Sequence, residues 1–405
     1  MTPDELRIAG FLDPRRALDY FEELPGGAEV WAADLGASAD PDQALLAAIR
    51  LHEADSGLVQ GLVDDSRARA RLCAVLGGSQ WLGDYVVAEP GRARSTWEDP
   101  GDAARVMLAS VGATRGERGA FVASEDARVD DLRGAYRQVL LYLAADDLTS
   151  DDPEGFMPQV GRRIADLVDA TLEAGLALAR RDIDPQGRIP FAIIAMGKTG
   201  ARELNYISDV DVVYVAEAGA DGDERVALEI ATRLAAATAS ACSGPGTEAP
   251  LWTVDANLRP EGRNGALVRT VESYRQYWDK WAQTWEFQAL LKAVRSTHET
   301  SQLDHIVIRN TLILKTLLEC RKVNEVAVRT LRIDGQICSI SLDRQLKSLT
   351  QSPNGSIHDT TPDPSNFPLW ISPYKSSFIR ASEPRMRKIA FVWSCDMRAS
   401  ERCSI

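Results

Sequence analysis

Residues 191–215 read FAIIAMGKTGARELNYISDVDVVYV, and this stretch decides the fold that we expect. An apolar run ends at a Gly-Lys turn, and a second apolar run begins at Asp209-Val-Asp211. Because side chains alternate between the faces of a strand, both carboxylates should project from one face, with Cβ atoms about 6–7 Å apart. Such a pair can hold one or two Mg²⁺ ions beside a turn where Gly197 lets a phosphate approach the backbone. The pattern favours phosphoryl or nucleotidyl transfer.

A third carboxylate occurs in a similar setting. Asp255 lies in a strand-like run, residues 251–260, that ends at Pro260. An Asp-x-Asp pair alone is more often a solvated strand edge than a catalytic pair. The glycine turn and the additional carboxylate shift the interpretation toward a metal platform. We therefore predict that Asp209, Asp211 and Asp255 are the catalytic residues and the ligands of Mg²⁺.

Four further residues are candidates for the nucleotide and phosphate pocket. Gly197 and Ser208 would bound the pocket through backbone and hydroxyl donors, and Lys198 or Arg259 would neutralise phosphate charge. For each of the two cations, a surface or structural ion pair is an equally compatible role.

Gly197-Lys198-Thr199 also resembles the end of a phosphate-binding P-loop. A P-loop begins a sustained helix whose N-terminus faces the phosphates. The residues between Thr199 and Ser208, where the next strand should begin, leave room for about two helical turns at most. A P-loop-like ATP hydrolase, which would turn over ATP without a protein substrate, is the less favoured hypothesis.

Three long motifs resemble those of one family. They are MGKTGARELNYISDVD (196–211), VDANLRPEGRNGALV (254–268) and WAQTWEFQALLKA (281–293). In order and spacing they are similar to the bifunctional glutamine synthetase adenylyltransferase/adenylyl-removing enzymes, with mild departures at Thr199, Ala201 and Asn257. Their position after a helical N-terminal region resembles the first, adenylyl-removing half of that family.

The resemblance implies a Mg²⁺-dependent, polymerase-β-like nucleotidyltransferase that regulates nitrogen assimilation. Inorganic phosphate would attack AMP carried on a tyrosine of glutamine synthetase and release ADP, whereas the companion half of the family adds AMP from ATP. The PII signalling protein is a second expected partner. The alternative is a catalytically inactive, truncated fragment that only binds glutamine synthetase or PII.

Composition changes abruptly at about residue 293. Residues 1–293 hold 30 Lys and Arg against 48 Asp and Glu, a net charge of −18, whereas residues 294–405 hold 16 against 11, a net of +5. We expect the family region to be truncated there and followed by an atypical, poorly ordered tail with a short helix near residues 305–329. The tail's cations are scattered, and Cys395 and Cys403 lack the spacing of a zinc site.

The whole chain is predicted to be α+β, with a helical N-terminal region (1–150), a nucleotidyltransferase domain with a small mixed sheet (151–293) and the tail (294–405). Asp13-Pro14 and Asp40-Pro41 each place an N-cap before a proline that begins a helix. Longer helices are expected at 132–144 and 164–179. An aromatic series is expected to form one helix face that packs on the sheet: Tyr274, Tyr277, Trp278, Trp281 and Trp285.

The acidic body argues against a nucleic-acid partner, since phosphate affinity requires clustered cations. No apolar stretch reaches the roughly 18–20 residues needed to cross a bilayer, and no secretory signal is recognised at the start of the chain. Few, dispersed cysteines fit a reducing compartment. We therefore expect a cytoplasmic protein without a membrane partner.

Overall fold

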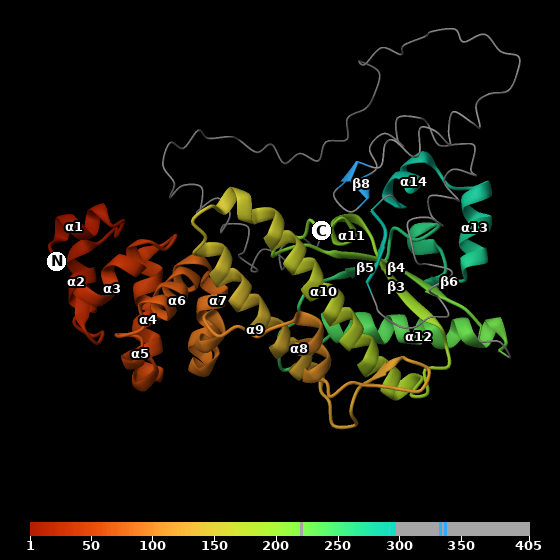
Figure 1. Cartoon of the computed structure of the whole chain (residues 1–405), viewed down its shortest axis with the longest axis horizontal. Coiled ribbons are helices and arrows are strands. Elements are labelled where there is room, and N and C mark those ends of the chain that lie inside the picture. Colours follow the sequence, from red (N-terminus) through yellow and green to blue (C-terminus); the bar gives the residue numbers. More distant parts are fainter. Residues whose placement is uncertain (219–221, 291, 297–331, 334–335, 338–405) are drawn as a thin grey trace, which may run out of the picture.

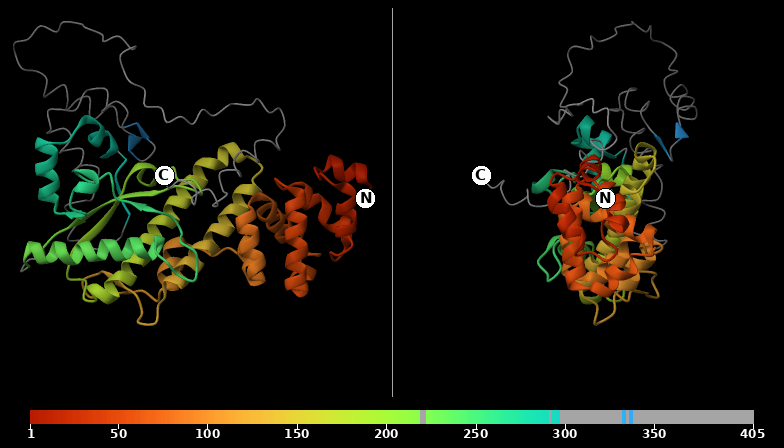
Figure 2. Two further views of the ribbon diagram at one scale, coloured as in Figure 1. Left: turned by 180° about the vertical axis from the view of Figure 1, so that it is seen from behind. Right: turned by 90° about the vertical axis from the view of Figure 1, so that its left-hand side faces the viewer.

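The computed structural model describes residues 1–218, 222–290, 292–296, 332–333 and 336–337. The fold is α+β, as predicted: helices extend from the N-terminus, and a small mixed sheet lies at the other end of the described chain (Figure 1). The view from behind in Figure 2 shows the same separation of the first helices from the sheet. The predicted helix near residues 305–329, like most of the tail, lies outside the described residues.

The N-terminal region is built from short helices that follow one another along the chain. Asp13 and Asp40 cap two of them, accepting the backbone N–H groups of Arg16 at 3.2 Å and Gln43 at 2.9 Å, so these two predicted helix starts are confirmed. The elements are α1 (Pro3–Ile8), α2 (Pro14–Phe21), α3 (Gly27–Gly36), α4 (Pro41–Ala54), α5 (Ser56–Gly61), α6 (Ser66–Gly78), α7 (Gln80–Ala88), the 3-10 helix η1 (Pro90–Thr96) and α8 (Ala103–Ser110).

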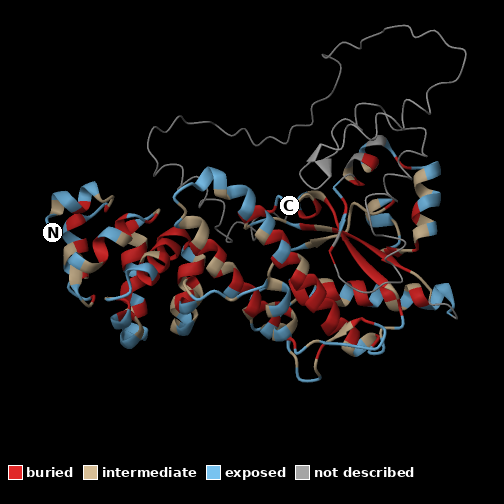
Figure 3. Cartoon of the chain, viewed as in Figure 1, coloured by how far each residue is buried: buried red, intermediate tan, exposed pale blue. Residues whose placement is uncertain are grey.

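Two long helices join this region to the sheet. The predicted helices at 132–144 and 164–179 are confirmed within α9 (Val129–Leu148) and α10 (Pro153–Ile183). The stripe Ile164, Val168, Leu172 and Leu176 of α10 is fully buried. Helix α10 packs against α8, α9 and α12 (Glu224–Ser243), and much of it is coloured as buried in Figure 3. A small hairpin, β1 (Thr114–Arg115) and β2 (Phe121–Val122), lies against α10.

The mixed sheet is arranged around one strand, β4 (Val210–Ala216). On one edge β4 is antiparallel to β3 (Phe191–Ala195), which is itself antiparallel to β7 (Val294–Arg295). On the other edge β4 is parallel to two short strands, β5 (Val254–Asp255) beside its beginning and β6 (Val268–Arg269) beside its end. A separate described pair, β8 (Arg332–Ile333) and β9 (Gln336–Ile337), is antiparallel.

Both faces of the sheet are covered, as the continuous apolar runs require. Phe191, Val212 and Tyr214 pack into the core formed with α10 and α12. The alternate residues, among them Ile194 and Val213, pack against α13 (Val271–Lys280) and α14 (Thr284–Leu290). The connections between these layers include the short helix α11 (Gly197–Ala201) and the 3-10 turn η2 (Gly262–Asn264).

Two predictions about apolar side chains are wrong. The run Leu45, Leu46 and Ile49 after Asp40-Pro41 predicts an apolar stripe on α4, but Leu46 is 43% exposed. Of the aromatic series, Tyr274 is buried, whereas Trp281 and Trp285 are 68% and 55% exposed. The series does not form one helix face, because α13 ends at Lys280 and Trp285 belongs to α14. In the described part of the chain, no helix combines the length and the apolar character required to cross a membrane.

Candidate functional site

Two carboxylates lie side by side where β4 and β5 pair. Asp211 of β4 is in register with Asp255 of β5, and the Val210 N–H donates to the Thr253 carbonyl at 2.9 Å next to them. Residues in register on neighbouring strands project from the same face, with the strands about 4.8 Å apart. The prediction that Asp255 occupies a strand next to Asp211 is confirmed. The predicted length of that strand is wrong, because β5 ends at Asp255 and residues 256–265 form a series of hydrogen-bonded turns.

Asp209 lies just outside the strand pair. Strand β4 begins at Val210, so Asp209 precedes it by one residue, and its side chain is exposed. Burial raises the pKa of the half-buried Asp211 carboxyl, and the negative charges of Asp255 and then Asp209 add to this effect. All three carboxylates therefore influence the same site. Within the described ranges, however, no three His, Cys, Asp or Glu side chains converge as a metal-binding group.

Gly197 forms the wall of the site opposite Asp211. Its φ is +50°, a left-handed conformation that glycine adopts readily. A Cβ atom at this position would lie 2.2 Å from Oδ2 of Asp211, and the Met196 N–H donates to the Asp211 carbonyl at 2.8 Å. The turn and the strand are therefore held in direct contact, and only glycine fits between them.

The short helix after this turn distinguishes the site from a P-loop. Helix α11 contains only Gly197–Ala201, and Arg202 ends it in a left-handed conformation with φ of 58°. The prediction that a sustained helix cannot follow Thr199 is confirmed. A five-residue helix does not supply the long dipole and the row of backbone donors that a P-loop presents to phosphates.

The predicted phosphate-binding residues differ in what they contact. Lys198 is exposed, and its charge lowers the pKa of Asp211, which places it near the carboxylates. The Ser208 hydroxyl donates to Oδ1 of Asn205 at 2.7 Å. Lys198 therefore lies at the open side of the site, and Ser208 stabilises the loop that leads to Asp209.

Arg259 holds a loop through backbone carbonyls, rather than through the ion pair that was its predicted alternative to phosphate binding. Its guanidinium donates to the backbone carbonyls of Ala256 at 2.8 Å, Gly265 at 3.2 Å and Arg263 at 3.3 Å. These contacts close the loop that follows β5. In the same turn the Asn257 N–H donates to Oδ1 of Asp255 at 2.7 Å, which fixes the orientation of that carboxylate.

The sequence did not indicate the role of Arg202, whose guanidinium joins the end of α11 to α10. Arg202 forms ion pairs with Asp166 and, at 3.6 Å, with Asp169 of that helix. Asp169 also accepts a hydrogen bond from the buried Ser296, next to β7, and burial raises its pKa to about 7. No local pattern indicates these contacts, because the partners are distant in the sequence.

Comparisons with known proteins show which family this chain resembles. The family model described as glutamate-ammonia ligase adenylyltransferase matches residues 69–305. Proteins from Streptomyces avermitilis and Streptomyces coelicolor are 44% identical over 299 residues and 40% identical over 359 residues, covering 70% and 84% of this chain. A Mycobacterium bovis protein is 42% identical over 272 residues, or 64% of this chain. Each is named as a bifunctional glutamine synthetase adenylyltransferase/adenylyl-removing enzyme.

The chain spans 28%, 34% and 25% of the length of these three relatives. The matched residues 69–305 contain all three motifs, at 196–211, 254–268 and 281–293. The alignment with the Streptomyces coelicolor protein spans 359 residues and 84% of this chain. It therefore extends beyond residue 293, where the composition changes. The division of the chain into regions 1–150, 151–293 and 294–405 stays a prediction.

Proposed function

We propose a function for this chain on one premise: it belongs to the glutamate-ammonia ligase adenylyltransferase family. The family is one of nucleotidyltransferases, and the names of the relatives identify glutamine synthetase as the protein on which they act. The proposed activity is the Mg²⁺-dependent removal of AMP from a tyrosine of glutamine synthetase by phosphorolysis. Because the chain spans about a third or less of its relatives, we propose this for the segment rather than for both reactions of the family.

The observation that carries the proposal is the register of Asp211 with Asp255. Mg²⁺ is commonly held by one or two protein carboxylates, with substrate phosphates and water completing its octahedron. Asp211 and Asp255 are a half-buried pair of like charges, and the pKa of Asp211 is raised. A cation bound between them would reduce their repulsion. Asp209, at the exposed rim, is the proposed additional ligand. When bound, Mg²⁺ neutralises phosphoryl oxygens and orients the attacking and leaving groups.

The other residues of the site would bind and orient the phosphates. Gly197 keeps the turn close to the carboxylates, so the phosphates can approach the backbone there. Lys198, exposed beside Asp211, is the proposed cation for the phosphate charge. Ser208 and Arg259 hold the two loops that flank the carboxylates, through the contacts with Asn205 and with the carbonyls of residues 256–265.

In the proposed reaction an oxygen of inorganic phosphate forms a bond to the phosphorus of the tyrosine-linked AMP. The bond between that phosphorus and the tyrosine oxygen breaks, ADP is released, and the tyrosine oxygen takes up a proton. Catalysis of such an in-line displacement depends mainly on positioning and charge neutralisation. PII as a partner, a cytoplasmic location and the lack of nucleic-acid and membrane partners stay predictions.

The test is phosphate-dependent ADP release from adenylylated glutamine synthetase. We expect Asp211→Asn to reduce the rate by at least about 100-fold, because the metal contributes several kcal/mol of charge stabilisation. The matched control is Asp84→Asn, which removes a carboxylate that pairs with Arg50 at 2.8 Å on an exposed surface of α7. The control should retain the wild-type rate.

Two results would contradict the proposal. A folded chain that binds glutamine synthetase without releasing ADP would support the inactive-fragment alternative. ATP hydrolysis without any protein substrate would instead support the P-loop-like hydrolase.

A further inference from the structure

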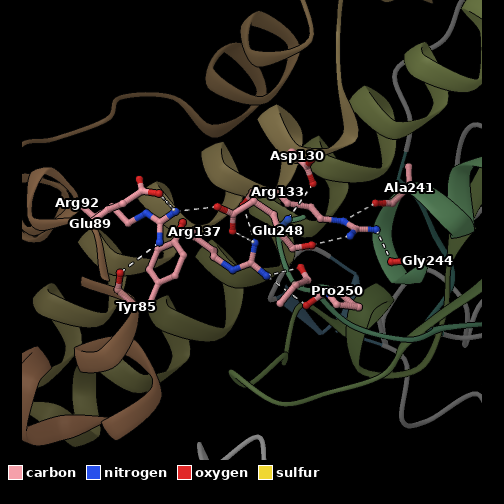
Figure 4. Close-up of polar contacts among 11 residues, drawn as sticks. Tyr85, Glu89, Arg92, Asp130, Arg133, Arg137, Ala241, Gly244, Glu248 and Pro250 are labelled. Atoms are coloured by element: carbon pink, nitrogen blue, oxygen red, sulfur yellow. Dashed lines mark hydrogen bonds and ion pairs between the residues drawn. The ribbon is translucent and has the colours of Figure 1, made fainter. Parts of the chain in front are cut away.

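A group of ion pairs gathers three distant parts of the chain around Glu248, which follows α12 (Figure 4). One carboxylate oxygen of Glu248 accepts from Arg92 of η1 at 2.7 Å, and the other accepts from Arg137 of α9 at 3.1 Å. The Arg137 side chain is only 2% exposed. A charge that is so deeply buried requires a partner, and Glu248 supplies it.

The same helix also holds the backbone around Glu248. Arg137 donates to the carbonyls of Ala249 and, at 3.3 Å, Pro250. One turn away, the fully buried Arg133 donates to the carbonyls of Glu248 at 2.8 Å, Ala241 at 3.0 Å, Gly244 at 2.7 Å and Ser240 at 3.3 Å. Asp130 accepts the Glu248 N–H at 2.9 Å. Residues 240–250 are thus fixed by side chains of α9.

This fixed segment leads directly into the strand that carries Asp255. Only the residues 251–254 separate Pro250 from Asp255, and such a stretch reaches at most about 17 Å. It is further tied down where the Leu251 N–H donates to the Cys242 carbonyl and where the Thr253 carbonyl accepts from β4, both at 2.9 Å. Because so few residues lie between them, a displacement of Pro250 should also displace Asp255.

The N-terminal helices take part in the same group. The guanidinium of Arg92 lies 3.7 Å from the ring centre of Tyr85, and that of Arg137 lies 5.6 Å from it and 5.5 Å from the ring of Trp81. Tyr85 and Trp81 both belong to α7 and are stacked on each other. Helix α7 is therefore in contact with Arg137, which holds Ala249 and Pro250, and η1 contacts α7 and Glu248 through Arg92.

We propose that Arg92, Arg137 and Glu248 are positioning residues that keep Asp255 in register with Asp211, and that they thereby set the affinity of this carboxylate pair for a divalent cation. The inference rests on the proposed function. It adds that α7 and η1 act on the cation site through Arg137 and Glu248. A merely structural role would lower the stability of the fold and leave the cation affinity unchanged.

The experiment measures Mn²⁺ binding to the full chain by calorimetry. We expect Glu248→Gln to raise the Mn²⁺ dissociation constant about tenfold, in the range typical of residues that orient metal ligands. The matched control is Asp34→Asn, because Asp34 pairs with Arg69 at 2.7 Å, and its side chain is 21% exposed against 20% for Glu248. That pair lies in the N-terminal helices, so the control should lower the melting temperature without changing the Mn²⁺ affinity.

Hydrogen exchange gives a readout that does not depend on metal. The amides of residues 251–255 should exchange faster in Glu248→Gln than in the wild type, and at the wild-type rate in Asp34→Asn. If Glu248→Gln does not fold, Arg92→Gln replaces it, because that variant retains the pair of Arg137 with Glu248.

Two further outcomes separate this inference from the proposed function. Asp255→Asn with wild-type Mn²⁺ affinity would overturn the cation site itself. If Asp255→Asn weakens Mn²⁺ binding but Glu248→Gln alters neither the affinity nor the exchange of residues 251–255, the positioning role is wrong and the cation site stands.

Discussion

The helices near the N-terminus and the strand pair β4–β5 are stabilised in different ways. In α2 and α4 the contacts are mostly local and favourable: a capping carboxylate, a proline in the first turn and a buried apolar stripe. In β4–β5, Asp211 and Asp255 place like charges side by side, and Gly197 is in a left-handed conformation against one of them. The first region therefore stabilises the fold, whereas the second keeps two like charges side by side, whose repulsion the proposed cation would reduce.

The largest expected effect comes from a methyl group placed between the turn and β4. Gly197→Ala should reduce ADP release by about 100-fold or more, because its Cβ would lie 2.2 Å from Oδ2 of Asp211 and would displace that carboxylate. It should also destabilise the fold by at least about 1–2 kcal/mol, the cost of the left-handed backbone for alanine. Enzyme assays and urea denaturation measure the two effects.

Gly27→Ala is the control from the helical region. Gly27 has a similar φ of +55°, but the nearest atom to its Cβ position is the Phe21 carbonyl oxygen at 3.7 Å. It should show the loss of stability alone. If Gly27→Ala reduces activity as much as Gly197→Ala does, the contact with Asp211 is not the cause.

Local features of the sequence predicted the helical region well. The Asp-Pro pairs at 13–14 and 40–41 mark helix starts because N-cap hydrogen bonds and the fixed φ of proline act within a few residues. The strand positions of Asp211 and Asp255 were also predictable, since each adjoins an apolar run, but the register that pairs them was not. The beginning of β4 at Val210 was not, because the ends of a strand depend on where its partner begins to pair.

Contacts between distant residues could not be predicted from the sequence. Trp281 and Trp285 have the spacing of a packed face, but whether a face is buried depends on which element covers it. The hydrogen bonds from Arg259 to three loop carbonyls depend on how residues 256–265 turn. The ion pairs of Glu248 join residues 92, 137 and 248, and no periodic pattern connects them.

A matched pair of leucines tests the helical side of the comparison. Leu45→Ala should lower the free energy of unfolding by about 3 kcal/mol, because Leu45 is 1% exposed and its removal leaves a cavity. Leu46→Ala, at a position that is 43% exposed, should cost less than about 1 kcal/mol. Equal losses in urea denaturation would contradict the packing of α4 described above.

A pH-dependent effect is expected from Asp169, which lies on α10 and joins it to the turn through Arg202. Burial raises its pKa from 3.8 to about 7 in the folded state, so the fold favours the protonated form. The stability contributed by that form is present below about pH 4 and is lost as the pH rises from about 4 to 7.

The variant Asp169→Asn should lack this decrease. As the pH rises from 4 to 7.5, the unfolding free energy of the wild type should therefore fall by about 4 kcal/mol relative to that of the variant. Chemical denaturation across this pH range measures it. A constant difference would show that Asp169 is ionised in the fold throughout.

The most direct test of the account is the anomalous scattering of a Mn²⁺-soaked crystal of the chain. We predict a peak between the carboxylates of Asp211 and Asp255, with oxygen distances of about 2.0–2.5 Å, and its loss in Asp255→Asn. A well-ordered β4–β5 pair without a peak, or a peak that contacts neither carboxylate, would contradict the claim that these strands form a divalent-cation site.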